Sequence, residues 1–215
     1  MHLKRQKSPK KWPIPRKETV YIVRPDSNLG KGLPILIILR EILKIVQNRK
    51  EAKKAIHFRN ILINNKPVID EKQSASLFDT ITMIPSKKYF RLELSEKGKF
   101  QVKEISEADA LRKIAKIISK KILKGKKTQL NLSDGQNFLS NLTCNINDSV
   151  LISFKDKKIE KCLPLREKAN IMIFDGKHAG SIGTVVKIDN KNKMAEVNLE
   201  EKPANILIKQ LMVTG

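Results

Sequence analysis

The hydrophobic pattern of residues 33–46 predicts a helix. In the stretch LPILIILREILKIV, apolar residues recur every three or four positions, as they do along one side of a helix. These positions are Leu36, Leu39, Leu43 and Val46. Arg40 and Lys44 fall off that side, so we expect them to stay at the surface while the apolar side is buried.

A second helix is predicted after a break at Asn48. Its small and apolar residues form a stripe suited to burial: Ala52, Ala55 and Ile56. Its cations lie on or near the opposite side: Arg49, Lys50, Lys53 and Lys54. Burial and charge are therefore separated on this helix, which leaves four positive side chains available to a partner.

Short strands follow the two helices. Residues 61–63 and 68–69 are apolar, and a turn at Asn64, Asn65 and Lys66 separates them. Because asparagine tolerates a positive φ angle, Asn64 and Asn65 can form a tight hairpin turn. Residues 78–84 complete this unit as a strand that ends before Pro85.

The region from 87 to 165 combines predicted strands with one predicted basic helix. Ser106 followed by Asp109 resembles a capping box, and Gly125 sits where a helix would end, so we expect a helix over 107–124. The strands are expected at 90–94, 100–105 and 149–154.

The predicted helix has an apolar side and a cationic side. The apolar residues are Leu111, Ile114, Ala115, Ile118 and Ile122, and the cations are Arg112, Lys113, Lys116, Lys120 and Lys124. No acidic residue occurs from 111 to 127. The cationic side can contact phosphates, remain a solvated face or lie on an anionic membrane. Because the apolar side has no Trp or Phe, packing on neighbouring strands explains it better than a membrane does, and we favour phosphate contact.

Downstream, the stretch QLNLSDGQN (129–137) predicts a hairpin. Leu130 and Leu132 alternate with polar residues before Asp134 and Gly135, a dipeptide that favours tight turns.

The region from 166 to 215 predicts a small β-barrel. Its first two strands are joined by the loop DGKHAGSIG (175–183). Glycines at 176, 180 and 183 allow positive φ angles and close backbone approach, so Lys177 and His178 can be presented to a phosphate or a base edge. The strands are expected at 171–174, 184–188, 195–199, 206–209 and 211–213.

The net charge of the chain indicates what kind of partner it binds. The formal net charge is +22 and the pI is about 10.0. A compact protein with that charge repels itself unless a polyanion neutralises it, and nucleic acid is the polyanion that this composition favours.

The first 32 residues form a basic arm, with cations at Lys4, Arg5, Lys7, Lys10, Lys11, Arg16, Lys17, Arg24 and Lys31. Four prolines prevent a continuous helix, so we expect an extended arm that orders on RNA. The alternative is a solvated, disordered tail. Trp12, the only tryptophan, can pack on the body of the protein or stack on a base or sugar.

Nothing in the sequence predicts a catalytic centre, a metal site or a cofactor. His2, His57 and His178 lie in different regions, with no cysteine or carboxylate at ligand spacing. Cys144 and Cys162 are too few for a disulfide framework, and we expect two reduced thiols. We therefore expect neither an enzyme nor a small-molecule substrate.

The sequence does not match a nucleotide phosphate-binding loop, a signal peptide or a membrane-spanning segment. The Gly176-Lys177 pair is followed by His178 where a phosphate-binding loop requires Ser or Thr. The basic amino terminus has no apolar run behind it, and LPILIILREIL is too short to span a bilayer, so we expect a cytoplasmic protein with no membrane partner.

Several segments in the same order resemble the small-subunit ribosomal protein family of archaea and eukaryotes called S four e. They are HLKR (2–5), SPKKWPIPRK (8–17), LPILIILREIL (33–43), RKEAKKAI (49–56) and QLNLSDGQN (129–137). Residues 33–84 resemble the S-four RNA-binding fold, and 173–199, with GKHAGSIGTVVKI, resemble a KOW motif. Within that resemblance, the Lys/Ile/Asn-rich composition favours a reduced or AT-rich archaeal genome as the source.

The resemblance implies a role for particular residues. The basic helical positions of the S-four motif are matched by Arg40, Arg49, Lys50 and Lys53. Its hairpin and closing strand are matched by Asn64, Lys66 and Asp79. The glycines of the KOW motif are matched by Gly176, Gly180 and Gly183. Asn65 occupies the hairpin position where the family usually has glycine. The resemblance also implies a place in the small ribosomal subunit, on the five-prime region of its rRNA and beside other ribosomal proteins.

Two rival functions have weaker support in the sequence. Some pseudouridine synthases carry an S-four fold, but they need a larger catalytic domain with a key Asp, and the region after 85 has no Arg-Leu-Asp segment. A non-ribosomal transcription or translation factor with a KOW motif stays open as the alternative, although a basic arm with three basic modules suits permanent burial in rRNA.

Together these patterns predict a multi-domain α+β protein that is a structural, rRNA-binding constituent of the small subunit. Its parts are a basic arm (1–32), an S-four-like α/β domain (33–86), a central mixed β domain with one basic helix (87–165) and a small KOW β-barrel (166–215). The predicted rRNA-binding residues are Lys4, Arg5, Lys10, Lys11, Trp12, Arg16, Lys17, Arg40, Lys44, Arg49, Lys50, Lys53, Lys54, Lys66, Lys113, Lys116, Lys120, Lys177 and His178.

Overall fold

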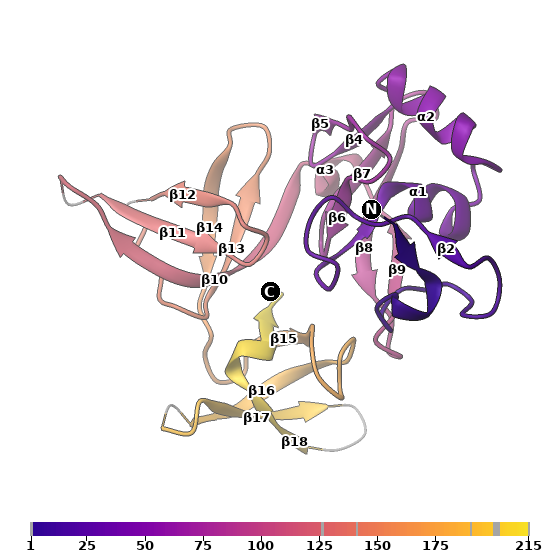
Figure 1. The fold of residues 1–215 in the computed structure, drawn as a ribbon. Helices are drawn as coiled ribbons and strands as arrows, with labels where there is room; N and C mark the ends of the chain where they lie inside the picture. The colour runs from indigo at the N-terminus through magenta and orange to yellow at the C-terminus, as the bar shows by residue number, and fades with distance from the viewer. Residues whose placement is uncertain (1, 126, 141, 190, 200–202, 215) are drawn as a thin grey trace. The chain divides into compact units, whose positions relative to one another are not determined.

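The computed structural model describes residues 2–125, 127–140, 142–189, 191–199 and 203–214. The chain divides into two compact units. Unit 1 comprises Met1–Ser95 and Lys99–Leu111, and unit 2 comprises Glu96–Gly98 and Arg112–Gly215. Antiparallel sheets dominate both units, and the described helices are few and short (Figure 1). The four-part division expected from the sequence stays a prediction.

Unit 1 is built on a five-stranded antiparallel sheet with the strand order β5-β4-β7-β8-β9. Its strands are β4 (Ile61–Ile63), β5 (Lys66–Pro67), β7 (Thr80–Met83), β8 (Lys88–Leu94) and β9 (Phe100–Glu104). Two smaller pairs accompany it: β1 (Leu3–Lys4) with β2 (Tyr21–Ile22), and β3 (Gly32–Pro34) with β6 (Ser74–Ser76). The helical elements are η1 (Arg5–Lys7), α1 (Ile35–Ile37), η2 (Ile38–Ile42), α2 (Arg49–His57) and α3 (Glu107–Ala110).

The first predicted helix is helical from 35 to 42, and its second part, η2, has π-helical hydrogen bonding. Its burial differs from the expected one-sided pattern. Five consecutive side chains, Ile35 to Leu39, are at most 1% exposed. The run of apolar residues thus forms a helix buried on all sides at the centre of unit 1, and only its last turn carries a polar side.

Unit 2 contains two five-stranded antiparallel sheets, with the strand orders β12-β11-β10-β13-β14 and β18-β17-β16-β15-β19. The first has β10 (Arg112–Ile122), β11 (Thr128–Leu132), β12 (Asn137–Leu139), β13 (Ser149–Ser153) and β14 (Lys158–Leu163). The second has β15 (Asn170–Ile173), β16 (Ile182–Asp189), β17 (Met194–Leu199), β18 (Pro203–Leu207) and β19 (Leu211–Val213), with η3 (Ile208–Gln210) before β19.

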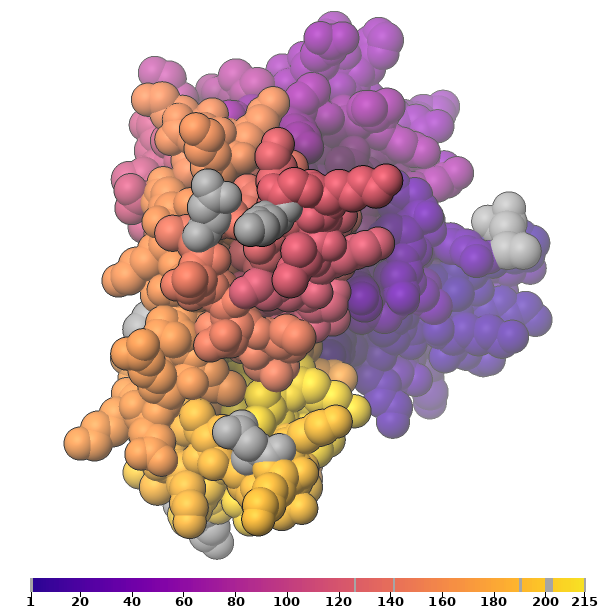
Figure 2. Space-filling model, turned by 90° about the vertical axis from the view of Figure 1, so that its left-hand side faces the viewer, coloured from indigo at the N-terminus to yellow at the C-terminus, as the bar shows by residue number. Residues whose placement is uncertain are grey.

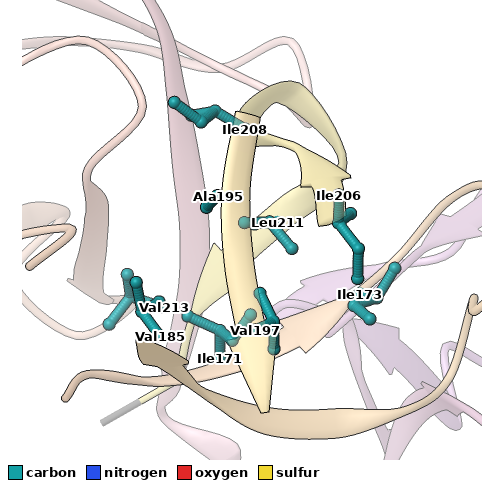
Figure 3. Close-up of a cluster of buried hydrophobic side chains, with 9 residues drawn as sticks. All are labelled: Ile171, Ile173, Val185, Ala195, Val197, Ile206, Ile208, Leu211 and Val213. Carbon is teal, nitrogen blue, oxygen red and sulfur yellow. The ribbon is translucent and has the colours of Figure 1, made fainter. Parts of the chain in front are cut away.

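The second sheet curves around its own core. Side chains from all five strands and from η3 form one apolar cluster (Figure 3). The cluster consists of Ile171, Ile173, Val185, Ala195, Val197, Ile206, Ile208, Leu211 and Val213. Four of the five strands expected for 166–215 are present, whereas the strand expected at 206–209 lies earlier, as β18, and Ile208 and Lys209 belong to η3.

The predicted basic helix over 107–124 is wrong. The cap is real, because the Ser106 hydroxyl accepts a hydrogen bond from the Asp109 N–H at 3.3 Å, but the helix ends at Ala110. The rest of the segment is β10, whose first half pairs with β13 and whose second half pairs with β11. The following strand β11 and the sequence-distant strand β13 supply hydrogen-bond partners, and together they outweigh the local helical spacing of isoleucines that themselves favour strands.

Candidate nucleic-acid interface

The amino terminus of α2 is capped by side chains. The Asn48 side-chain oxygen accepts a hydrogen bond from the Glu51 N–H at 3.0 Å, and the Glu51 carboxylate accepts one from the Gln47 N–H at 2.8 Å. These contacts satisfy backbone donors that have no partner inside the helix, and they make Arg49 the first helical residue.

The two sides of α2 are as predicted. Ala52 is fully buried and Ile56 is 5% exposed. The cations on the other side are all exposed: Arg49, Lys50, Lys53 and Lys54. A positively charged surface is thus held on a helix whose position is set by its apolar residues.

Glu71 interacts with two of these four cations, Arg49 and Lys53. Its carboxylate is buried, accepts a hydrogen bond from Arg49 Nε at 3.0 Å, and lies 3.9 Å from Lys53 Nζ. Burial acts to raise the pKa of Glu71, but the hydrogen bonds from Arg49 and neighbouring groups outweigh it and hold the pKa below its ordinary value of 4.5. Within the described part of the chain, Lys50 and Lys54 have no side-chain partner. They are therefore the cations of α2 most available to a phosphate.

The hairpin between β4 and β5 adopts the predicted turn. Asn64 and Asn65 have φ angles of 52° and 60°, so Asn65 keeps the turn without the glycine usual in the resembling family. Asn64 Nδ2 donates to Asp79 Oδ1 at 2.8 Å, and Asn64 Oδ1 accepts from the Thr80 N–H at 3.0 Å. Asn64 and the buried Asp79 hold the hairpin in place, which leaves Lys66 exposed at its end.

Arg5 does not reach the surface, so its predicted role in binding RNA is wrong. It is 4% exposed. Its guanidinium donates to the carbonyls of Thr19 and Pro15, each at 2.8 Å, and forms an ion pair with Glu18 at 3.3 Å. Because these partners lie 10 to 14 residues away, Arg5 ties the arm into a folded loop.

The prediction that Trp12 contacts rRNA is also corrected by the structure. Only 2% of it is exposed, and its indole Nε1 donates to the Gly32 carbonyl at 3.1 Å. Of the two alternatives, packing on the body is the one realised, because a buried ring with a satisfied N–H has no face free for a base. The arm is folded onto unit 1 rather than extended.

The arm still presents cations around a cavity of about 490 Å³ in unit 1. Lys10, Arg16 and Lys99 lie at this cavity beside the apolar Trp12 and Ile14. Lys99 was not expected from the sequence. The neighbouring Phe100 N–H donates to the Lys11 carbonyl at 2.8 Å, and this long-range contact, which no local pattern signals, brings Lys99 to the arm.

Lys113 and Lys116 are buried in unit 2, so neither serves as a surface contact for RNA. Lys113 Nζ donates to Asp134 Oδ2 at 2.7 Å, and both side chains are interior. Lys116 Nζ donates to the carbonyls of Ile208 and Leu211, the latter at 2.8 Å. Burial lowers the pKa of Lys116 to about 8. Lys113 thus holds the β11–β12 turn against its own sheet, and Lys116 joins the first sheet of unit 2 to the second.

The far end of β10 keeps its cations at the surface. Lys120 is exposed, with Nζ 3.2 Å from the Cys144 carbonyl oxygen that accepts its hydrogen bond. Lys121, Lys124 and Lys127 are exposed as well. Lys121 was missed because the helical projection placed it off the cationic side, and Lys127 was missed because it lies beyond the end of the predicted helix.

The glycine loop between β15 and β16 presents Lys177, which is exposed, and His178, which is half-buried. Gly176 and Gly180 have φ angles of 92° and 97°, as predicted. Gly183 does not take a positive φ angle, and that part of the prediction is wrong. Its role is close approach, because a Cβ there would lie 2.5 Å from the Asn198 carbonyl oxygen on β17.

The remaining predicted residues divide by exposure. Lys4, Lys10, Arg16, Lys17 and Lys44 are exposed, and Lys11 and Arg40 are half-buried, with Arg40 Nη2 2.8 Å from the Glu41 carboxylate. The arm, α2 and the β4–β5 hairpin belong to unit 1. The β10–β11 turn and the glycine loop belong to unit 2.

Two kinds of feature are absent from the described residues. No cluster of three or more His, Cys, Asp or Glu side chains among them could hold a metal ion. No described helix is long and apolar enough to cross a membrane. Cys144 and Cys162 are free thiols.

Two family models match the chain. Residues 86–159 match the model described as ribosomal family S4e, the family written S four e above, and residues 1–27 match the RS4NT domain. Both matches lie in segments whose fold was described above.

Curated relatives and a solved structure extend the likeness to most of the chain. A protein named small ribosomal subunit protein eS4 from Methanocella arvoryzae is 33% identical over 190 residues, which cover 87% of this chain and 80% of that protein. Its namesake from Methanothermobacter thermautotrophicus is 34% identical over 191 residues, covering 87% of this chain and 79% of that protein. The crystal structure of the 30S ribosomal protein S4e from Thermoplasma acidophilum has a TM-score of 0.74 at 22% identity, covering 86% of this chain and 96% of that one.

Proposed function

Because this chain belongs to the ribosomal protein family S4e, we propose that it is a structural constituent of the small ribosomal subunit, bound to small-subunit rRNA in the cytoplasm. Its contribution to translation is to hold rRNA in place. Lysine and arginine side chains neutralise phosphates and release counterions, which gives affinity with little base specificity.

The observation that carries this proposal is the free positive charge of α2. Lys50 and Lys54 are exposed on a rigid helix, and the described part of the chain holds no partner for either side chain. The end of the β4–β5 hairpin adds the exposed Lys66 in the same unit. A fixed row of unpaired cations suits the regular spacing of phosphates along an RNA strand.

The finer details belong to the same proposal. We propose that the rRNA contacted is the five-prime region, that the glycine loop acts as a KOW motif with Lys177 and His178 near phosphate or base edges, and that neighbouring ribosomal proteins complete the site. Several modest surfaces on one chain gain effective concentration from their connection, so they can hold several rRNA helices together.

Two other functions have less support. The relatives named above carry ribosomal names, so a non-ribosomal transcription or translation factor is not supported. The net charge of +22 suits permanent burial in rRNA, and we propose that the chain performs no turnover of its own.

Fractionation of ribosomes tests the function directly. A tagged copy of the chain should sediment with small subunits at a constant ratio to rRNA, and it should stay there after a wash at high salt. A transient factor would be released by the same wash and recovered at the top of the gradient. Recovery of the chain there would overturn the proposal.

A further inference from the structure

The β10–β11 ribbon, residues 117–132, extends beyond the core of its sheet. Leu130 is fully buried and pairs with Lys120. Past this pair, from 121 to 129, no described residue is buried. Two further residue pairs and the turn carry the end of the ribbon roughly 10 Å past the core, at about 3.3 Å per residue. In Figure 1 the ribbon runs outward from its own sheet, and Figure 2 shows long side chains standing out from this part of the surface.

A backbone hydrogen bond closes the outer end of the ribbon. The Leu123 N–H donates to the Lys127 carbonyl at 2.8 Å, which closes the hairpin. Gly125 has a φ angle of 80°, a conformation that glycine adopts without strain. The described residues Leu123 and Lys127 are therefore held to each other across the end of the ribbon.

All the charged residues of the ribbon are positive. Five lysines occur between 118 and 128, and no acidic residue occurs between Asp109 and Asp134. Lys121, Lys124 and Lys127 are exposed and have no side-chain partner within the part of the chain that the structure describes. Holding these like charges on one narrow hairpin costs free energy that a polyanion would offset.

The ribbon also exposes apolar side chains. Ile118 is 52% exposed and Ile122 is 74% exposed. Exposed β-branched residues on a hairpin that projects into solvent invite aggregation unless a partner covers them. Lysine is depleted at protein–protein interfaces, whereas it is a usual contact for phosphates, so the chemistry favours RNA over protein as that partner.

We propose that the β10–β11 ribbon enters the rRNA as a finger, with Lys121, Lys124 and Lys127 on phosphates and Ile122 against ribose and base surfaces. This inference rests on the proposed function and adds a contact point to it. The shallow minor groove of an RNA helix or a junction between helices offers both phosphates and sugar surface to such a finger, whereas the deep major groove is too narrow for it.

A matched pair of variants tests the finger. In the full chain, K121A/K124A/K127A removes three charges from the tip, and K155A/K157A/K158A removes three exposed charges from the β13–β14 hairpin of the same sheet. Binding of each protein to small-subunit rRNA is measured from about 0.1 to 0.4 M salt, with hydroxyl-radical footprints of the rRNA. All six lysines are exposed, so circular dichroism melts of both variants should match the wild type.

The expected result is specific to the tip. The tip variant should bind about 10- to 100-fold more weakly at about 0.1 M salt, and the slope of log K against log salt should fall by about 2. It should also lose protection of one local group of nucleotides. The control variant should change affinity by less than about threefold.

Three outcomes would overturn the finger while leaving the proposed function intact. The tip variant could keep the wild-type slope and footprint, the control could lose as much affinity as the tip variant, or crosslinks from the tip in assembled subunits could reach a protein and no RNA. Failure of the wild-type chain to bind rRNA at all would instead contradict the proposed function, and the finger with it.

Discussion

At the scale of single residues, several cations predicted to bind RNA instead hold the protein together. Arg5, Lys113 and Lys116 are each at most 4% exposed, and each is paired with carbonyls or a carboxylate. A buried charge needs such partners because its desolvation is costly. High charge in the sequence therefore overstates the number of cations free for RNA.

Glu71 gives the first prediction. Replacing it by Gln removes the buried carboxylate that Arg49 and Lys53 share, and unit 1 should lose about 1–2 kcal/mol at pH 7, a modest figure because both cations are partly exposed to solvent. The folded-state pKa of Glu71 is lowered, so its stabilisation is present above 4.5 and is lost as the pH falls through the folded-state pKa.

Urea denaturation at neutral and acidic pH measures this effect. The difference in unfolding free energy between the wild type and Glu71→Gln should shrink as the pH falls below 4.5. The exposed Glu167→Gln, which removes one carboxylate elsewhere, should stay within about 0.5 kcal/mol of the wild type at each pH. A pH-independent gap for Glu71→Gln would contradict the ion-pair explanation.

Gly183 gives a second prediction at this scale. A Cβ at this position would meet the Asn198 carbonyl oxygen at 2.5 Å and Val197 Cγ1 at 3.0 Å, so Gly183→Ala must push β16 away from β17. Unit 2 should lose about 1–3 kcal/mol, measured by chemical denaturation. Gly30→Ala is the control, because a Cβ there meets only Asn28 Oδ1, at an ordinary 3.7 Å. Equal stability of the two variants would mean that the strands can separate freely.

At the scale of elements, α2 provides a direct test of the RNA surface. K50E/K54E reverses two exposed charges that have no side-chain partner in the described chain, so folding should be unaffected. Affinity for small-subunit rRNA should fall about tenfold or more at about 0.1 M salt, measured by filter binding. Arg49 and Lys53 are less suitable, since their reversal would place acidic groups beside the buried Glu71.

The control for α2 is K155E/K157E, which makes the same change in net charge on the β13–β14 hairpin of unit 2. If this variant loses as much affinity as K50E/K54E, then net charge alone sets the binding and α2 has no special place in it. A melting temperature that drops for K50E/K54E would instead show that its lysines support the fold.

Local patterns predicted α2, the Asn64–Asn65 turn and most of the strands of the second sheet of unit 2, because caps, positive-φ residues and alternation act within a few residues. They failed for β10. Ile114 and Ile118 are spaced as on a helix, but pairing with β13, which is distant in sequence, and with β11, which follows in a hairpin, decides the conformation. The sequence also could not decide between burial and base stacking for Trp12, since its partner Gly32 lies 20 residues away.

At the scale of the whole molecule, the net charge of +22 acts on stability as well as on binding. Like charges at the surface repel one another more in the folded chain than in the expanded one, and salt screens this repulsion over about 10 Å at 0.1 M. The free protein should therefore be least stable at low ionic strength.

Calorimetry in rising potassium chloride measures the size of this self-repulsion. The melting temperature should rise by several degrees between about 0.02 and 0.3 M salt, because weakening the repulsion by about 1 kcal/mol shifts a midpoint by about 2–4 °C in a protein of this size. A polyanion such as heparin should reproduce the rise at low salt, whereas an uncharged osmolyte should act equally at all salt concentrations. A melting temperature that falls with salt would mean that attractive pairs such as Arg49–Glu71 outweigh the excess positive charge, and that the free chain does not need a polyanion to relieve it.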